Sequence, residues 1–264
     1  MARGRTAKVL VRRGDGAARP QVAPDELIVE EPLRVQLDGH LVGTTMRTPG
    51  HDFELAAGLC FGDGLLAGAP VRTVRYCATG SASDTAWNVV TVDTAGRAPV
   101  PEARLGAVSS SCGLCGSTVL DGLADRLDPL PPGAPWDAGV LAGVPDRLAE
   151  AGTLFRSTGA VHAAAAFDRT LDTVVVREDI GRHNAVDKVV GRLLLDGRLP
   201  ARDLGLYVSG RASFEIVQKA WAAGFGALVS VSAPSALAVE AARRAGITLV
   251  GFVRGARWNQ YAPV

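Results

Sequence analysis

The chain has 264 residues, 47% of them hydrophobic and 21% charged, which suffices for one large domain or two modest ones. Its 28 basic and 27 acidic side chains leave a net charge of +1, so the composition gives no general attraction to nucleic acid or to an anionic membrane. No run of about 18 apolar residues is present, and four cysteines are too few for a secreted disulfide scaffold. We therefore expect a cytoplasmic protein without a membrane span, in which any anion site is local.

The N-terminal region begins with a basic stretch rich in Gly and Ala, and we expect residues 1–20 to be a flexible tail. Within it, Arg12 and Arg13 are followed by Gly-Asp-Gly rather than by an apolar run, so the pair is not a twin-arginine or secretory signal. The next part has the pattern of short strands, with a hairpin turn at Asp38-Gly39. The expected strands are 27–29, 33–37 and 87–92, and a helix is expected from residue 51 or 52 to 59.

The second half of the chain alternates regularly between strand and helix patterns. Strands are expected at 173–176, 204–208, 227–231 and 247–253, and helices at 186–194, 213–223 and 234–245. Such alternation predicts an α/β domain with a mainly parallel sheet covered by helices. A Pro- and Gly-rich stretch at 129–143 marks the break from the first half. We accordingly predict a smaller β-rich N-terminal subdomain at 21–143 and the α/β domain at 144–264.

Polar, Gly-rich and Arg-bearing segments follow the predicted strands of the second half. They are 177–184, 209–211, 232–234 and 254–257. In open α/β sheets, ligands lie beyond the carboxyl ends of the strands, where these segments converge. Any one of them has ordinary loop composition, but arginine forks and helix N-termini together predict a site for phosphate or pyrophosphate. The candidate residues are Arg182, His183, Ser209, Gly210, Arg211, Arg254 and Arg257.

The densest polar cluster is the run from Arg177 to Lys188. Such a density of ionisable groups at a strand end is typical of a functional site or its support. Structural roles are open as well. Asn184 and Asp187 have the spacing of a capping pair for the following helix, and the acidic residues at 178 and 179 have Arg182 as a nearby partner.

Two cysteines stand in the segment Ser111-Cys112-Gly113-Leu114-Cys115-Gly116, directly before a predicted helix that starts near residue 117. A helix N-terminus favours a thiolate and lowers a cysteine's pKa below its free value of about 8.5. The flanking glycines leave both sulfur atoms open to a large partner. We therefore interpret Cys112 and Cys115 as an exposed, nucleophilic dithiol and as the reactive centre of the protein.

Three functions are compatible with such a pair. A structural zinc site needs four ligands, but Cys60 and Cys77 stand alone in apolar stretches, as small buried side chains do, and no histidine has ligand spacing. No metal site is therefore predicted. A thioredoxin-like dithiol follows a strand directly and has an aromatic residue or Pro between its cysteines, unlike the Gly-Leu found here. Sulfur transfer is the interpretation we favour, although CxxC alone is a weak signal.

The chain resembles the FdhD/NarQ family, the formate dehydrogenase accessory sulfurtransferases, from about Glu26 to Tyr261. The resemblance is carried by blocks in the family's order, of which Arg-Glu-Asp-Ile-Gly-Arg-His-Asn-Ala-Val-Asp-Lys is the most distinctive. The blocks are residues 30–33, 46–52, 110–116, 158–162, 177–188, 209–215 and 251–255. One departure is Cys-Phe-Gly-Asp-Gly at 60–64, where the family more usually has Leu-Phe-Thr-Glu-Gly.

The resemblance implies a sulfur carrier with sulfurtransferase activity. Family members accept sulfur from a cysteine desulfurase as a persulfide on the CxxC loop. They pass it to the molybdenum or tungsten of a bis-molybdopterin guanine dinucleotide cofactor, which then enters formate dehydrogenase. We expect Cys112 to carry the persulfide and Cys115 to act as a relay thiol or as the thiol that attacks it. The resemblance also suggests a homodimer, and the alternative function is a chaperone that binds the molybdenum cofactor without transferring sulfur.

A cytidine-deaminase-like fold is implied for the C-terminal region, where the guanine nucleotide portion of the cofactor, mimicked by GDP, would bind. The family's nucleotide-binding stretch corresponds to Phe252, Val253, Arg254, Gly255, Ala256 and Arg257. Deaminase chemistry itself needs His-x-Glu and Pro-Cys-x-x-Cys around zinc. Here alanines follow His162, no Pro precedes Cys112, and the cysteines come before the histidine, so deamination is excluded.

Overall fold

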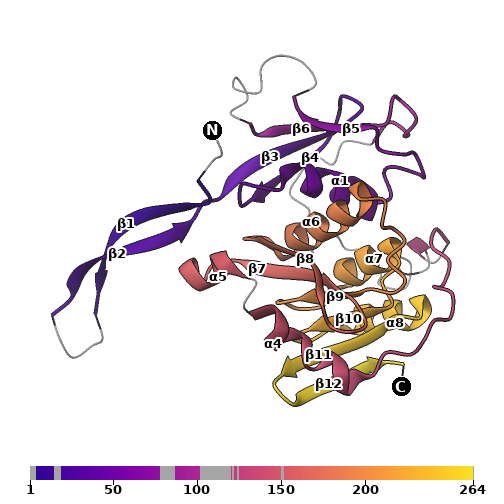
Figure 1. The fold of residues 1–264 in the computed structure, drawn as a ribbon. Coiled ribbons are helices and arrows are strands. Elements are labelled where there is room, and N and C mark those ends of the chain that lie inside the picture. The colour runs from indigo at the N-terminus through magenta and orange to yellow at the C-terminus, as the bar shows by residue number, and fades with distance from the viewer. Residues whose placement is uncertain are drawn as a thin grey trace.

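The structure is a computed structural model that describes residues 4–14, 19–77, 87–101, 120, 122–123, 125–149 and 152–263. A small sheet and a larger one lie one above the other with helices between them, and a two-stranded arm projects to one side (Figure 1). The small sheet comes from the first part of the chain and the large one from the second. This arrangement confirms the predicted class, an α/β unit beside a smaller β-rich unit.

The small sheet has the strand order β4-β3-β6-β5. Its strands are β3 (Glu31–Leu37), β4 (His40–Arg47), β5 (Thr73–Tyr76) and β6 (Val89–Asp93). The predicted turn between β3 and β4 is confirmed, with positive φ at both Asp38 and Gly39. Helix α1 (Asp52–Gly62) covers the sheet and closes a core that includes Leu33, Val35, Leu55 and Val90.

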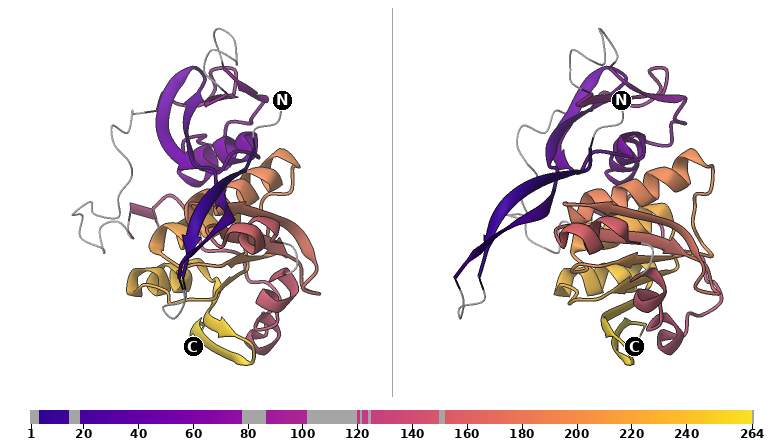
Figure 2. Two further views of the ribbon diagram at one scale, coloured as in Figure 1. Left: turned by 90° about the vertical axis from the view of Figure 1, so that its left-hand side faces the viewer. Right: turned by 60° about the vertical axis from the view of Figure 1, so that its left-hand side comes forward.

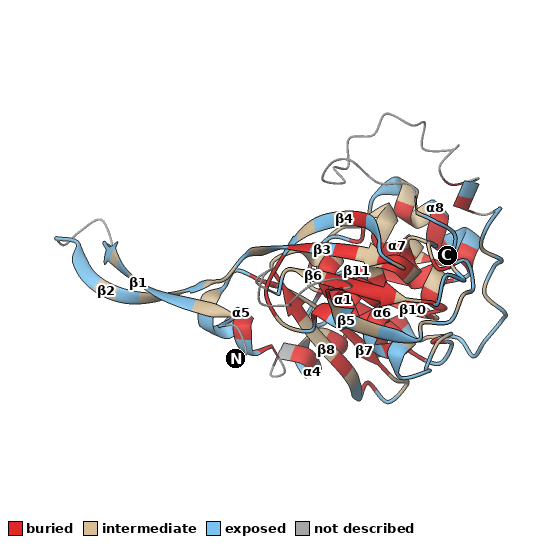
Figure 3. Ribbon diagram, turned by 90° about the horizontal axis from the view of Figure 1, so that it is seen from above, coloured by how far each residue is buried: buried red, intermediate tan, exposed pale blue. Residues whose placement is uncertain are grey.

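The arm consists of β1 (Thr6–Arg13) and β2 (Gln21–Ile28), paired antiparallel along their whole length. Two further views show that it hangs beside one edge of the large sheet, and burial colouring shows it mostly exposed (Figures 2 and 3). The prediction of a flexible tail at residues 1–20 is therefore wrong for residues 6–13. The apolar side chains of β1, at 7 and 9–11, all stay at least partly accessible, so the strand is stabilised by pairing with β2 rather than by burial in a core.

The large sheet has six strands in the order β12-β11-β10-β9-β7-β8. They are β7 (His162–Phe167), β8 (Thr173–Asp179), β9 (Gly205–Val208), β10 (Ala227–Ser230), β11 (Thr248–Arg254) and β12 (Arg257–Ala262). The pairings give β8, β9, β10 and β11 one direction and β7 and β12 the other. The two reversed strands were not predicted, because β7 is mainly alanine and β12 is polar and mostly exposed.

Helices cover both faces of the large sheet. On one face lie α6 (Arg182–Leu195), α7 (Phe214–Ala223) and α8 (Ala236–Ala245), and on the other lie α3 (Ala138–Leu141) and α4 (Val144–Ala149) (Figure 1). The first face is closed by Val189, Ile216 and Ala241, and the second by Leu141, Phe167 and Val229. A short helix, α5 (Thr153–Thr158), lies close to β2 of the arm.

The described residues at 120–142 pack with the large sheet. Leu120 and Leu123 are buried in the core of the α6–α8 face, and the indole of Trp221 donates a hydrogen bond to the carbonyl of Asp128 (2.8 Å). The prediction placed residues up to 143 in the N-terminal subdomain. The packing instead places the described residues at 120–142 with the C-terminal unit. The Pro- and Gly-rich stretch at 129–143 runs along the C-terminal unit, where the backbone of Leu130 donates to Ala245, instead of joining two units.

The two units meet where α1 packs on α6, at two glycines. A Cβ on Gly58 would lie 1.9 Å from the carbonyl oxygen of Asp187, and one on Gly191 would lie 1.8 Å from that of Glu54. Glycine costs about 1 kcal/mol relative to Ala in a helix interior, but only hydrogen fits here. The two backbones therefore approach closely, which brings the polar side chains around α1 and α6 together.

Candidate functional site

The carboxyl ends of β9, β10 and β11 lie at one edge of the large sheet, with the N-termini of α6, α7 and α8 (Figure 1). The residues before α6 and α7 are Gly181 and Ser213, and neither gives its helix a side-chain cap. Uncapped N–H groups and the helix dipole both favour a bound anion. This edge thus offers two open helix N-termini to a phosphate.

Arg182, Gly210 and His162 are in contact at this edge. A Cβ on Gly210 would lie 3.4 Å from Nδ1 of His162 and 3.5 Å from Cδ of Arg182. Ser209 Oγ lies 3.5 Å from the same Nδ1. Burial lowers the pKa of His162, and the positive charges of Arg182 and His183 lower it further, so the imidazole is neutral at pH 7. The fixed positive charge beside it is that of Arg182.

Arg254 and Arg257 lie opposite each other in the hairpin of β11 and β12, and both are exposed. Gly255 takes a positive φ of 54° in the turn between them, and Ala256 completes it. The hairpin continues outward from the sheet edge, so the two guanidinium groups stand on a projecting turn. Both guanidinium groups are accessible to a ligand, and their binding of phosphate stays a prediction.

The other residues of this predicted site differ in their surroundings. Arg211 is exposed, and Phe252, with its side chain 49% exposed, donates its backbone N–H to the carbonyl of Ser232 (3.2 Å). Val253 is buried in the core of the α3–α4 face. Its side chain has no access to a ligand, so only its backbone remains available to the predicted binding stretch.

His183 reaches toward Ser213 and the first turn of α7. Its Nε2 lies 2.9 Å from Oε2 of Glu215 and 3.2 Å from Oγ of Ser213. The hydrogen bond from His183 lowers the pKa of Glu215 and outweighs the effect of burial, so Glu215 is ionised at neutral pH. Both side chains line a pocket of about 750 Å³ between the two units. Glu215 was not predicted as a site residue from the sequence, although Glu215 ends the matched block at 209–215.

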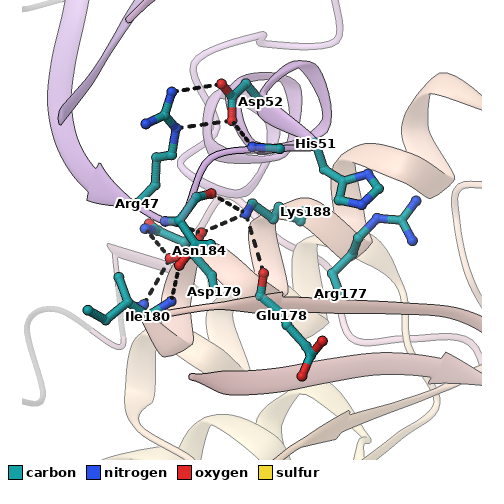
Figure 4. A network of polar contacts seen from close by, with 12 residues as sticks. Arg47, His51, Asp52, Arg177, Glu178, Asp179, Ile180, Asn184 and Lys188 are labelled. Carbon is teal, nitrogen blue, oxygen red and sulfur yellow. Dashed lines mark hydrogen bonds and ion pairs between the residues drawn. The ribbon is translucent and has the colours of Figure 1, made fainter. Parts of the chain in front are cut away.

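A buried polar network joins the two units (Figure 4). Arg47, with no exposed side-chain surface, pairs through Nη2 with Oδ2 of Asp52 at 2.9 Å and through Nη1 with Glu31 at 3.3 Å. On the opposite side, Lys188 pairs with Asp179 at 2.6 Å and donates to the carbonyl of Thr48 at 3.0 Å. Thr48 in turn connects to Asp179 through its backbone N–H (3.2 Å). The matched blocks at 46–52 and 177–188 are therefore the two halves of one brace.

A second ion pair reinforces this brace. Arg177 on β8 donates from Nη2 to Oε1 of Glu54 on α1 at 2.7 Å, and His51 lies 3.5 Å from the same carboxylate. Burial alone would raise the pKa of Glu54, but the hydrogen bonds from Arg177 and His51 outweigh it and hold the pKa at about 2. His51 precedes α1 and makes no side-chain cap hydrogen bond to it.

The structural roles considered for the acidic and amide residues at the end of β8 and in α6 are wrong. Asn184 does not cap the helix. Its Nδ2 donates to Met46 O (2.7 Å) and to Asp179 (3.0 Å), while Asp187 pairs with Lys219 at 2.7 Å. The acidic residues at 178 and 179 do not pair with Arg182 either. Glu178 accepts three hydrogen bonds from the backbone N–H groups of residues 153–155, and Asp179 pairs with Lys188.

Cys112 and Cys115, the predicted reactive centre, lie outside the described residues. Cys60 and Cys77 are described, and both are buried, which confirms their interpretation as small buried side chains. Burial raises the pKa of Cys60 to about 12, and the charge of Asp63 raises it as well, so this thiol is unreactive at neutral pH.

Within the described part of the chain, no helix is long and apolar enough to cross a membrane. The same residues contain no group of three or more His, Cys, Asp or Glu side chains arranged to hold a metal ion.

The fold and the site define a two-unit α/β protein whose sheet edge is suited to an anionic ligand. The chain matches the FdhD/NarQ family over residues 28–264, and it belongs to that family.

Its relatives agree with this assignment. The chain is 46% identical over 272 residues to a "Sulfur carrier protein FdhD" of Streptomyces avermitilis, covering 99% of this chain and 95% of that protein. It is 45% identical over 249 residues to a protein of the same name from Corynebacterium efficiens, covering 90% of each. A crystal structure of a putative formate dehydrogenase accessory protein from Desulfotalea psychrophila has a TM-score of 0.73 at 25% identity, covering 98% of this chain and 96% of that one.

Proposed function

We propose that this protein carries sulfur as a persulfide on Cys112 and transfers it to the metal of a bis-molybdopterin guanine dinucleotide cofactor destined for formate dehydrogenase. The observation that carries the proposal is the CxxC pair in a chain of the FdhD/NarQ family, whose relatives are named sulfur carrier proteins. The name of the related crystal structure supports the link to formate dehydrogenase. On this proposal the protein is a sulfurtransferase of the cytoplasm.

The two thiols Cys112 and Cys115 are sufficient for the proposed sulfur transfer, and no resident cofactor is needed. The thiolate of Cys112 attacks the outer sulfur of a cysteine desulfurase persulfide, takes that sulfur and releases the desulfurase thiolate. The thiolate of Cys115 then attacks Sγ of Cys112 and expels hydrosulfide, and a disulfide forms between the two cysteines. Hydrosulfide and one proton from solvent then exchange with an oxo ligand of the substrate metal, which leaves a sulfido ligand and releases water. A cellular dithiol reduces the disulfide before the next round, so the two electrons come from thiols.

The sheet edge is the proposed binding place for the nucleotide ends of the cofactor. Arg254 and Arg257 lie opposite each other on an exposed hairpin, while Arg182 lies by the open N-termini of α6 and α7. These groups suit a pyrophosphate, because guanidinium forks and helix N-termini both donate to phosphate oxygens. GDP is the soluble probe for this site. Molybdenum and tungsten are both substrates that the proposal allows.

The partners follow from the reaction. A cysteine desulfurase supplies the sulfur and formate dehydrogenase receives the finished cofactor. A homodimer is part of the proposal through the family resemblance, and sedimentation of the full chain measures it directly.

Mass spectrometry of the protein after incubation with a desulfurase and cysteine tests the persulfide. The wild type should gain one sulfur atom on Cys112. That gain should disappear in Cys112→Ala and persist in Cys115→Ala. A gain that survives Cys112→Ala and vanishes in Cys115→Ala reverses the roles of the two thiols, and the absence of any gain in both the wild type and Cys115→Ala refutes the proposal. Cys60→Ala is the matched control, because that thiol is buried.

A further inference from the structure

The pocket between the two units adjoins the sheet edge, because Gly181 and His183 at the N-terminus of α6 line it. It lies between β4 of the small sheet and the helices α6 and α7, and its volume of about 750 Å³ is within the range of roughly 300–1,000 Å³ for small-molecule sites. Helices α6 and α7 contribute two ion pairs to its lining, His183 with Glu215 and Asp187 with Lys219. Four apolar side chains also line it, those of Val42, Met46, Leu59 and Ile180.

The pocket is acidic, in contrast to the arginine-rich edge. Among the described residues that line it are four carboxyl groups, at Glu30, Asp63, Asp187 and Glu215, and one lysine or arginine, Lys219. Lys219 is shared between two of these acids, at 2.7 Å from Asp187 and 3.3 Å from Asp63. Such a lining repels phosphate and favours a ligand that presents N–H donors.

Glu215 is the acceptor best placed for such donors. His183 holds one of its oxygens at 2.9 Å, and a carboxylate keeps further lone pairs free after one such bond. Its side chain is 38% exposed and therefore accessible from the pocket. Gln218, one helical turn away, lines the same pocket and adds an amide.

We infer that this pocket binds the pterin ring of the cofactor, with Glu215 accepting hydrogen bonds from the 2-amino group and N3–H of its pyrimidine edge. The apolar side chains contact the ring faces, and the acidic lining keeps phosphate groups out. The inference rests on the proposed function for the identity of the heterocycle. The requirement for an adjacent pair of N–H donors follows from the carboxylate acceptors that line the pocket.

Guanine has the same donor edge, so the position of the pocket decides between the two rings. The described chain resumes after the cysteine segment at Leu120, and Leu123 and Arg126 line a neighbouring hollow. That hollow shares Asp63 and Gln218 with the pocket. The metal is bonded to the pterin part of the cofactor, so the ring that must meet the sulfur donor belongs in the pocket beside the end of the cysteine segment.

The test uses 6-hydroxymethylpterin, whose fluorescence reports binding, and the matching lumazine, which has an oxo group in place of the 2-amino group. The wild type should bind the pterin at least about 10-fold more tightly than the lumazine, as expected for a lost hydrogen bond to a charged group. Glu215→Gln should abolish this preference. Glu240→Gln, on the exposed surface of α8 and outside the pocket, should retain it. Thr44→Trp, which places a large side chain on an exposed pocket-lining position, should block both probes.

Three outcomes overturn the inference. They are an equal affinity for pterin and lumazine in the wild type, a preference that persists in Glu215→Gln, and binding of guanosine with the same dependence on Glu215 when the pterin does not bind. Persulfide loading of the same variants is measured in parallel. Failure of pterin binding with normal loading rejects the pocket assignment alone, whereas failure of loading in the wild type rejects the proposed function.

Discussion

Replacement of Lys188 by Met removes the charge at the centre of the brace between the two units. Lys188 and Asp179 have no exposed side-chain surface, and their charged atoms lie 2.6 Å apart. Met has a similar length and fills the same volume, so the change is mainly electrostatic. After the substitution, Asp179 keeps hydrogen bonds from Thr48 and Asn184 but has no cation to neutralise it.

The expected cost is large. Removal of one partner of a buried ion pair typically costs about 3–5 kcal/mol, because the remaining charge stays in a medium of low polarity. Lys188→Met should therefore lower the free energy of unfolding by an amount in this range, measured by urea denaturation with tryptophan fluorescence and far-UV circular dichroism. Lys8→Met, on the exposed arm, is the matched control and should change it by less than about 0.5 kcal/mol.

A double-mutant cycle with Asp179→Asn separates the charge effect from the loss of packing. The double variant should be more stable than the sum of the two single losses predicts, by about 1–3 kcal/mol, because no unpaired charge is left. If the free energy of unfolding of Lys188→Met lies within about 1 kcal/mol of the wild-type value, this pair is not a structural brace.

Three further outcomes follow from the described contacts. The Arg254→Ala, Arg257→Ala double variant should bind GDP about 10- to 100-fold more weakly by calorimetry, and an unchanged affinity rejects the placement of the phosphates. Gly191→Ala should destabilise the protein by about 2–4 kcal/mol in urea despite the better helix propensity of Ala, because a Cβ there meets the backbone of α1; an increase in stability contradicts the close helix contact. Because its pKa is depressed to about 2 in the folded state, Glu54 stabilises the protein above pH 4.5 and loses this effect as pH falls toward 2. The stability difference between wild type and Glu54→Gln should therefore be about 2–3 kcal/mol at pH 7 and shrink steadily below pH 4.5, and a difference that does not change with pH counts against the ion pair.

The parts of the fold that were predicted from the sequence have local signals. The strands near residues 205, 227 and 248 are short apolar runs, and α6 shows its buried face in the spacing of Val186, Val189 and Leu193. The arm and β12 were missed because each is polar or half-exposed and is defined by its neighbour in the sheet. No pattern within eight residues contains that information.

The site was predicted unevenly for a similar reason. Segments that follow strands could be placed at one edge from topology alone, which identified Arg182, Gly210 and Arg254. Charged residues inside helices, such as Glu215 and Lys219, look like solvent-exposed positions in the sequence. Only the packing of β4 against α6 and α7 turns them into the walls of a pocket. Likewise, Arg47 is recognisable as buried only when Asp52 and Glu31 are seen around it.

Transfer of labelled sulfur to formate dehydrogenase is the most direct test of the central claim. The protein is loaded with ³⁵S through a desulfurase, freed of excess cysteine, and incubated with cofactor and apo-formate dehydrogenase. We predict that the label appears in the cofactor of the active enzyme with the wild-type protein, and that the Cys112→Ala, Cys115→Ala variant gives neither label nor activity. Equal activation by that double variant would contradict sulfur transfer and identify the protein as a cofactor chaperone.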